Sequence, residues 1–393
     1  MASTLQGYLD CSATTPLAPE VAAEMAHVQA SAWGNPSSLH GYGVAAAEVL
    51  ERSRQRLAMA LGCSGRLCFS SGGTESIHLA LLGAAAQLWS GNGQAPRLLI
   101  SAVEHPATNA AAERLAALGW QVERVPVTQE GLLDLEAFQQ LLAPPTRLVS
   151  LIWGQSEVGA LLPLTEIVQC CRQAGVLLHV DAVQVAGQQE ISFDALGVDL
   201  MSLAAHKLRG PRGIGLLLTR PGLELQPLFG GGGQEGGWRA GTEAVALIAG
   251  FALAVERRHR LLSEAPEAMV QLRDPLLQQL LDLPGLSLSG PDPSQQPSAR
   301  LPHHISLLVR SDAGLPLSGR AVVRQLWSQG FAISSGSACS AHGDARSPVL
   351  TAMGYDAATA ASGIRISLGD WHQPSDLHGL PEALRRARLE LST

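Results

Sequence analysis

Three residues whose side chains can do chemistry each close an apolar, strand-like stretch: His105 follows RLLISA, Asp181 ends VLLHVD and Lys207 follows VDLMSLAA. A lysine in this position can form a Schiff base with an aldehyde, although its commoner role is a surface charge on an apolar stem. An aspartate that ends an apolar strand needs a cation or hydrogen-bond donors, so it either caps a helix or keeps a cofactor's pyridine nitrogen protonated. A lone histidine is more often a satisfied polar residue than a catalytic one. Because the carboxyl ends of parallel strands meet at one edge of a sheet, the coincidence of all three favours a shared site.

A glycine-rich stretch and an arginine add to this set. SSGGTES (70–76) follows a strand-like run and opens a helical pattern, so its backbone N–H groups can hold a phosphate, although Ser71 or Thr74 can equally cap the helix. Arg365 lies in the apolar stretch GIRISLG and requires an anion, either a substrate carboxylate or an internal ion-pair partner. A phosphate cradle, a ring-stacking histidine, an aspartate for a ring nitrogen and a lysine for an aldehyde fit one cofactor, pyridoxal 5'-phosphate.

Cys339 lies in SSGSACSAHGD (334–344), a stretch of small and polar residues that favours irregular backbone. Its thiol is either an incidental surface group or a nucleophile that needs an accessible loop. His342, three residues further on, is a candidate to promote the thiolate form.

The elements that must position these residues follow from the hydrophobic pattern. Short apolar runs alternate with longer helical patterns over the first two thirds of the chain, which predicts an α/β fold with a mostly parallel sheet between helices. The tight connection RGPRG suggests that the last strand runs antiparallel. The predicted strands cover residues 66–70, 97–102, 120–127, 147–153, 176–182, 198–205 and 213–219.

The remainder of the chain predicts a smaller α+β domain. Residues 242–283 read as one long helix or two broken ones, and strand-like runs follow at 304–309, 331–336 and 364–369. We interpret the glycine run 229–242 as a flexible loop between the two lobes. The expected large domain covers residues 15–255. The expected small domain covers 1–14 and 256–393, and carries Cys339 and Arg365.

Composition excludes several classes of protein. The 393 residues are 46% hydrophobic and 16% charged with a net charge of −7, which is typical of a globular protein and lacks the basic surplus of a nucleic-acid binder. No apolar run reaches the length of a membrane helix, and the N-terminus does not read as a signal peptide. The six cysteines show no CxxC spacing. We therefore expect a cytoplasmic protein with reduced thiols, without a metal, a membrane or a nucleic-acid partner.

Nine motifs, in order and spread over nearly the whole chain, resemble those of the cysteine desulfurases, the NifS/IscS-like branch of the pyridoxal-phosphate-dependent class V aminotransferase family. The motifs are YLDCSATTPLAPEV (8–21), GNPSSLHGYG (34–43), FSSGGTES (69–76), EHPAT (104–108), HVDAVQ (179–184), HKLRGPRGIG (206–215), GGGQE with RAGT (231–242), SSGSAC (334–339) and IRISLG (364–369).

The resemblance implies a fold-type-I homodimer that converts L-cysteine to L-alanine and transfers the sulfur to Cys339 as a persulfide. That sulfur would pass to an acceptor or scaffold protein for iron–sulfur clusters or other sulfur compounds. The resemblance also implies a role for each site residue. Lys207 would form the Schiff base, and Arg365 would hold the substrate carboxylate. Asp181 would contact the ring nitrogen, Gln184 the ring hydroxyl, and His105 would stack on the ring and move protons. The phosphate would be bound by Gly73, Thr74 and His206, together with Thr242 of the partner subunit.

Four positions depart from the family pattern. Ser156 replaces an asparagine that contacts the cofactor, Ala204 replaces a phosphate-binding serine, and Gly236 and Asp370 replace arginines. None of these residues would form or break a covalent bond. Two other functions fit most of the same motifs: a related lyase, acting on cystine or selenocysteine without need of Cys339, and a non-catalytic homologue that serves as a binding protein.

Overall fold

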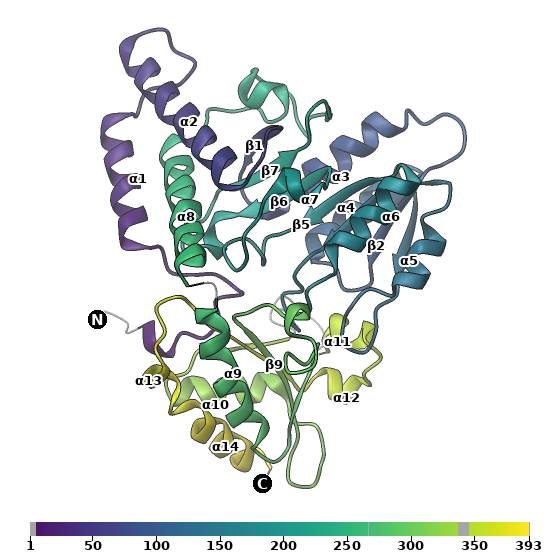
Figure 1. Cartoon of the computed structure of the whole chain (residues 1–393), viewed down its shortest axis with the longest axis vertical. Helices are drawn as coiled ribbons and strands as arrows, with labels where there is room; N and C mark the ends of the chain where they lie inside the picture. Colours follow the sequence, from purple (N-terminus) through teal and green to yellow (C-terminus); the bar gives the residue numbers. More distant parts are fainter. Residues whose placement is uncertain (1–4, 266, 337–345, 393) are drawn as a thin grey trace.

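The computed structural model describes residues 5–265, 267–336 and 346–392. Seven strands form one sheet in the order β1-β7-β6-β5-β4-β2-β3, and β7 runs in the direction opposite to all the others (Figure 1). The predicted α/β sheet, including its antiparallel strand, is confirmed. The strands are β1 (Arg66–Ser70), β2 (Arg97–Ser101), β3 (Gln121–Val125), β4 (Thr146–Ile152), β5 (Leu177–Asp181), β6 (Leu200–Ala204) and β7 (Gly215–Thr219).

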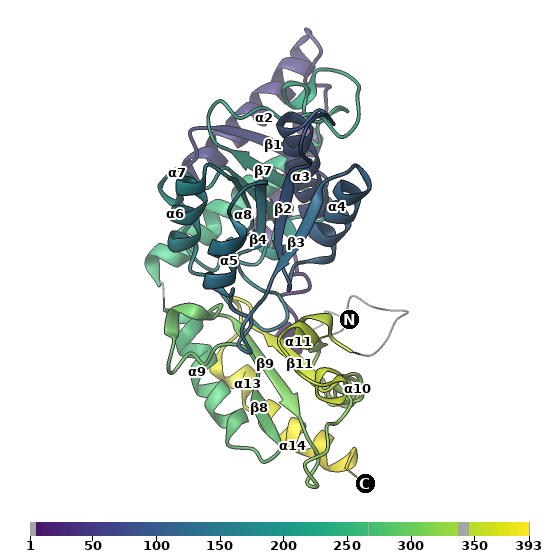
Figure 2. The same ribbon diagram turned by 90° about the vertical axis from the view of Figure 1, so that its right-hand side faces the viewer.

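Helices cover both faces of this sheet, as the nearly continuous apolar strands require. Leu98 and Ile100 pack with α3 and α4, whereas Leu99 between them packs in the opposite core, because successive side chains of a strand alternate between faces. Figure 2 shows α3 and α4 on one side of the sheet and α6 and α7 on the other. The helices on the α3 face are α3 (Gly73–Leu88) and α4 (Pro106–Ala117); the opposite core includes α2 (Gly41–Ala60), α5 (Leu135–Leu141), α6 (Leu164–Ala174), α7 (Phe193–Leu196) and α8 (Val245–Glu264), with α1 (Pro19–Ser31) packed against α8.

A second, antiparallel sheet lies below the first, in the order β10-β11-β9-β8. The N-terminal segment joins it through bridges from Tyr8 to Ala332 and from Asp10 to Ser367. These bridges tie Tyr8 and Asp10 to the small sheet, and the assignment of residues 1–14 to the small domain stays a prediction. Its elements are α9 (Ala268–Leu281), β8 (Leu286–Leu288), β9 (His304–Val309), α10 (Gly319–Ser328), β10 (Ser334–Ser335), α11 (Pro348–Ala352), α12 (Ala357–Ala360), β11 (Gly363–Ser367), α13 (Pro374–Leu377) and α14 (Leu380–Glu390).

One expectation was wrong. The glycine run 229–242 is not a flexible linker between lobes, because Glu235 and Trp238 are buried against the β1 end of the large sheet. Glu235 pairs with Arg54 at 2.9 Å, and the Arg66 guanidinium lies 3.8 Å from the ring centroid of Trp238. These contacts fix the position of this segment against the large sheet.

Candidate active site

The carboxyl edge of the large sheet collects the predicted residues. Asp181 is the last residue of β5, and β6 runs directly into the short 3-10 helix Ala205–Lys207. His105 is the N-cap of α4, four residues after β2 ends. Both β1 and β6 pair antiparallel with β7, so they run in the same direction, and the helix α3 therefore also starts at this edge. The sheet topology thus brings together segments that are far apart in sequence.

Lys207 and Gln184 converge on one backbone oxygen. The Lys207 Nζ donates to the carbonyl oxygens of Ser12 at 2.5 Å and Ala13 at 2.8 Å, and the Gln184 Nε2 donates to the Ser12 carbonyl at 2.9 Å. The N-terminal motif therefore forms one wall of the site, next to the lysine.

Asp181 and His105 interact electrostatically with each other and with Lys207. Burial raises the pKa of the Asp181 carboxyl, and His105, the Val183 N–H and Lys207 oppose that rise. Burial also lowers the pKa of His105, an effect that Lys207 reinforces and Asp181 opposes. A buried carboxyl of this kind is well suited to a protonated ring nitrogen, because such a partner would favour its charged form.

The N-terminus of α3 lacks a side-chain cap, unlike that of α4, where His105 accepts from the N–H of Ala107 at 3.1 Å. The first turn of α3, at Gly73 and Thr74, therefore offers unused N–H groups to an anion. The methyl group of Ala204 lies 3.6 Å from the position that a Cβ on Gly73 would occupy. The departure at Ala204 thus places an apolar group beside this cradle.

His206 faces the N-terminal motif. Its Nδ1 lies 3.1 Å from the Thr14 hydroxyl, and burial, together with Lys207 and Arg212, lowers the pKa of its imidazole to about 4. At neutral pH it is therefore an uncharged group that can donate one hydrogen bond. Thr242 is exposed on the surface and lines a pocket with Trp33 and Asn35, so its own subunit does not enclose it.

Arg365 is held by two acceptors before any substrate arrives. Its Nη2 lies 2.7 Å from Asp10 Oδ1, and its Nη1 donates to the Ser156 carbonyl oxygen at 3.0 Å. His304 Nε2 lies 3.1 Å from the same carbonyl. Ser156 thus meets the arginine through its backbone. The buried Nε of Arg365 has no hydrogen-bond partner in the part of the chain that the structure describes, so it remains an available donor.

Cys339 and His342 lie outside the described residues, but the structure describes the chain up to residue 336 and from residue 346 onward. Ser334 pairs with Arg365 across β10 and β11, so the last strand before Cys339 in the sequence lies beside the strand that bears Arg365. The Ser347 hydroxyl caps α11. Burial raises the pKa of the nearby Glu157 carboxyl to about 7, although Ser347 and the charge of Arg365 oppose that rise.

Sequence reasoning missed three acids at the site: Asp10, Glu104 and Glu157. Glu104 Oε1 accepts from the Ser101 hydroxyl at 2.6 Å and from the Ile152 N–H at 2.9 Å, which ties the ends of β2 and β4 together directly before His105. Asp10 and Glu104 lie inside quoted motifs, and Glu157 directly follows Ser156. Without the fold, no pattern distinguishes a buried acid from one that faces solvent.

The other two departures from the family pattern have local causes. Gly236 has φ +60°, a conformation that disfavours a side chain, and a Cβ there would lie 1.7 Å from the Nη2 of Arg66, so a larger residue requires the Arg66 side chain to move. Asp370 accepts hydrogen bonds from Arg209, which lies between β6 and β7, and from Arg257 of α8.

A lysine at the carboxyl edge of this seven-stranded sheet, beside a smaller antiparallel sheet, defines the fold-type-I architecture. The chain belongs to the class-V aminotransferase family, whose model matches residues 7–380. Its relatives within that family are cysteine desulfurases of the NifS/IscS type.

Two curated relatives cover nearly the whole chain. Cysteine desulfurase IscS of Dictyoglomus turgidum is 34% identical over 98% of this chain and 95% of its own length. Cysteine desulfurase NifS of Azotobacter vinelandii is 34% identical over 92% of this chain and 87% of its own. A solved NifS-like protein superposes with a TM-score of 0.86 at 32% identity, covering 96% of this chain and 98% of that one. SspA, solved in complex with cysteine, gives a TM-score of 0.79 at 28% identity, covering 93% and 100%.

Proposed function

We propose that this chain is a pyridoxal-phosphate-dependent cysteine desulfurase that transfers sulfur from L-cysteine to Cys339 and releases L-alanine. The observation that carries the proposal is the position of Lys207 at the carboxyl edge beside Asp181 and His105, with Arg365 fixed in the adjoining small sheet. Relatives named cysteine desulfurase over nearly the full chain support the same reaction.

The residues present fit the cofactor. Lys207 would hold the aldehyde, Asp181 the ring nitrogen and Gln184 the ring hydroxyl. The uncapped N-terminus of α3 would take the phosphate through Gly73 and Thr74, with His206 donating one hydrogen bond. Ser156 would lie at the edge of the ring. When bound, pyridoxal phosphate supplies an electron-accepting ring for the bonds of the substrate's α-carbon.

The protein's own groups would then divide the remaining work. Arg365 orients the substrate through its carboxylate, and His105 or Lys207 would move the α-proton, since both are titratable groups at this edge of the sheet. The Cys339 thiolate attacks the substrate sulfur, so an S–S bond forms as the C–S bond breaks. The carbon skeleton takes up protons and leaves as alanine, and the protein retains a persulfide that a sulfur-acceptor or iron–sulfur scaffold protein can collect.

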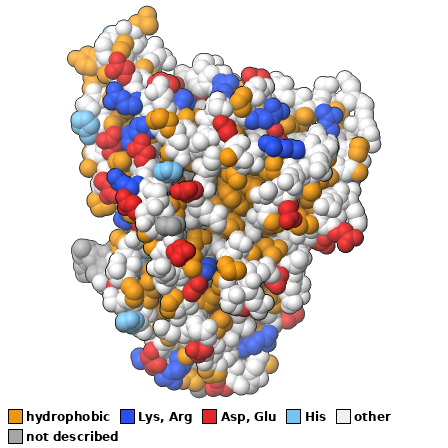
Figure 3. Space-filling model, in the orientation of Figure 1, with side chains coloured by type: hydrophobic (Ala, Val, Ile, Leu, Met, Phe, Trp, Pro, Cys, Tyr) orange, Lys and Arg blue, Asp and Glu red, His pale blue; other side chains and the backbone are white. Residues whose placement is uncertain are grey.

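We propose a homodimer, supported by an apolar surface at the loop between α1 and α2. Trp33, Leu39 and Tyr42 are 61%, 98% and 63% exposed there, and hydrophobic atoms are visible at this end of the molecule in Figure 3. Thr242 lines a pocket with Trp33 on the same surface. A second copy seated there would cover the apolar side chains and bring Thr242 to the partner's phosphate.

We propose a cytoplasmic location. The described cysteines, Cys11, Cys63, Cys68, Cys170 and Cys171, are all free thiols, which is typical of a reducing compartment. No described helix combines the length and apolar character needed to cross a membrane.

Alanine and sulfide release from L-cysteine, with a thiol reductant and added pyridoxal phosphate, tests the function. Equal amounts of both products from the wild type, and neither from Cys339→Ala, are expected. Cys170→Ala is the matched control, because Cys170 is the least buried of the described cysteines. Turnover that survives Cys339→Ala would instead indicate a lyase.

A further inference from the structure

Asp370 joins three arginines at the junction of the two sheets. It lies five residues after Arg365, and its side chain is 9% exposed. Its Oδ1 lies 3.2 Å from Arg209 Nη1, while its Oδ2 accepts from Arg257 and lies 3.4 Å from Arg258 Nη1. The three arginine side chains are themselves mostly buried, so these ion pairs are shielded from solvent and salt.

Arg209 connects Asp370 to the lysine. It stands two residues after Lys207 with φ +62°, a left-handed conformation that is unfavourable for a residue with a Cβ. The Arg209 N–H donates to Thr15 Oγ1 at 2.7 Å, and its guanidinium lies 4.8 Å from the ring centroid of Trp371. The strained backbone after the lysine is therefore held by the segment that begins at Asp370.

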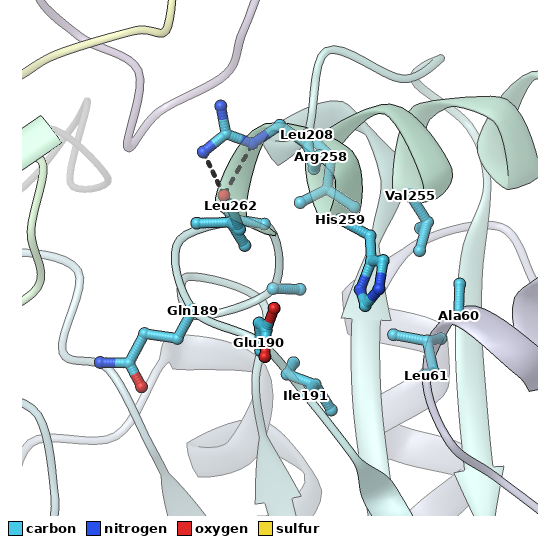
Figure 4. Close-up of a pocket in the computed structure, with 12 residues that line it drawn as sticks. Ala60, Leu61, Gln189, Glu190, Ile191, Leu208, Val255, Arg258, His259 and Leu262 are labelled. Atoms are coloured by element: carbon cyan, nitrogen blue, oxygen red, sulfur yellow. Dashed lines mark hydrogen bonds between the residues drawn. The ribbon is translucent and has the colours of Figure 1, made fainter. Parts of the chain in front are cut away.

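Arg258 connects Asp370 to the loop that follows Asp181. From α8, its guanidinium donates two hydrogen bonds to one carbonyl oxygen, that of Gly187, and the Nε bond measures 2.7 Å (Figure 4). Gly187 is three residues beyond Gln184. Arg257, the third arginine, reaches Glu20 at the start of α1 at 2.5 Å.

The charges of this cluster act electrostatically on the segment that holds Lys207. Burial disfavours the charged form of Asp370, but Arg258, Arg257 and Arg209 outweigh it and lower the pKa of the carboxyl. The thiol of Cys11 has its pKa raised by burial first and then by Asp10 and Asp370, so Asp370 lies within electrostatic range of it. Cys11 directly precedes Ser12, whose carbonyl oxygen accepts from Lys207.

We propose that Asp370 is a positioning residue that sets where Arg365 stands relative to Lys207, and so fixes the spacing between the protein groups that bind the substrate's carboxylate and its amino group. This inference rests on the roles proposed above for Arg365 and Lys207. An amino acid binds through both its carboxylate and its amino group only when β11 and the segment after Lys207 keep their spacing. Asp370 links the two, because it follows the strand that bears Arg365 and forms an ion pair with Arg209 of that segment. An amine without a carboxylate needs no such spacing.

The test compares Asp370→Asn with the wild type in two ways. In cofactor-loaded protein, the change in cofactor absorbance gives dissociation constants for L-alanine and for ethylamine, which lacks the carboxylate. In cofactor-free protein, hydrogen exchange reports on the backbone at residues 207–210. We expect L-alanine to bind at least tenfold more weakly, ethylamine to change less than twofold, and exchange at 207–210 to accelerate. Asp370→Glu should recover most of the L-alanine affinity.

Glu235→Gln is the matched control, because Glu235 is an equally buried carboxylate paired with an arginine in the large domain, without a link to Arg365. Arg209→Gln, which leaves Arg257 and Arg258 paired with Asp370, is measured in parallel in case Asp370→Asn does not fold. We expect it to weaken L-alanine binding more than ethylamine binding, by a smaller factor than Asp370→Asn does. Unchanged affinities in both variants, or equal losses for L-alanine and ethylamine, would overturn the proposal and leave an ordinary structural ion pair. Neither readout needs sulfur transfer, so a chain that binds the cofactor without releasing alanine still gives an answer.

Discussion

Arg365 and Asp10, 355 residues apart in sequence, form an ion pair of 2.7 Å between Nη2 and Oδ1 at the junction of the N-terminal segment and β11. The pair orients the guanidinium before substrate binds, and the Ser156 carbonyl fixes its second nitrogen. A substrate carboxylate therefore meets an arginine whose plane is already set, which lowers the entropy cost of binding.

Replacing Arg365 should weaken substrate binding without releasing the cofactor. A hydrogen bond to a charged group contributes about 1.5–3 kcal/mol, so Arg365→Gln should raise KM for L-cysteine roughly 10- to 100-fold. Steady-state kinetics measures this, and cofactor absorbance serves as the check on loading. Arg388→Gln is the control, because Arg388 is also a buried arginine of the small domain but pairs with Asp312 instead. A normal KM in Arg365→Gln would remove Arg365 from substrate recognition.

Lys207 is the only lysine in the chain, which makes the cofactor's attachment unambiguous. Borohydride reduction of the cofactor-loaded protein should leave a phosphopyridoxyl group on the peptide that contains Lys207, detected by mass spectrometry. Lys207→Ala should carry no such group on any side chain. A wild type that binds pyridoxal phosphate but yields no modified Lys207 peptide would contradict the assignment.

The buried acid Glu104 should make stability depend on pH. Burial raises the pKa of its carboxyl from 4.5 to about 8, and hydrogen bonds from Ser101 and Ile152 only partly offset this. The unfolded chain releases that proton near pH 4.5 and the folded chain near pH 8, so the free energy of unfolding falls as pH rises between these values. Glu104→Gln keeps the acceptor oxygen and cannot ionise. It should match the wild type below pH 4.5 and be more stable above pH 8, by roughly 5 kcal/mol.

Denaturant unfolding of cofactor-free protein at several pH values gives this comparison. The exposed Glu113→Gln should follow the wild type at every pH. Parallel curves for the wild type and Glu104→Gln would show that Glu104 is already ionised in the folded protein.

Ala204→Ser should tighten cofactor binding. Position 204 lies beside Gly73 at the uncapped start of α3, where a hydroxyl would face the phosphate that we place there. One added hydrogen bond to a charged phosphate would lower the cofactor's Kd by roughly tenfold. The buried hydroxyl lacks this partner in the cofactor-free protein, so thermal stability should fall there and recover on loading. Equal or weaker cofactor affinity would place the phosphate elsewhere.

The sequence predicted what depends on local pattern and not what depends on distant contacts. Apolar runs located the strands of the large sheet to within one or two residues, because buried parallel strands consist of continuous apolar residues; β5 and its terminal Asp181 are an example. The three-residue β8 is too short to produce such a signal. The ion pair of Asp10 with Arg365 and the arginines around Asp370 join segments that meet only in the folded chain. The glycine run 229–242 was misread because its buried Glu235 is anchored by Arg54, 181 residues away.

A single-turnover experiment tests the central claim, that sulfur passes from L-cysteine to Cys339, most directly. Cofactor-loaded protein receives one equivalent of L-cysteine carrying radioactive sulfur, in the absence of reductant. We expect one alanine per active site, and label that stays on the protein, maps to the peptide containing Cys339 and is released by a thiol reductant. Alanine without label on that peptide, or label that persists in Cys339→Ala, would contradict the account.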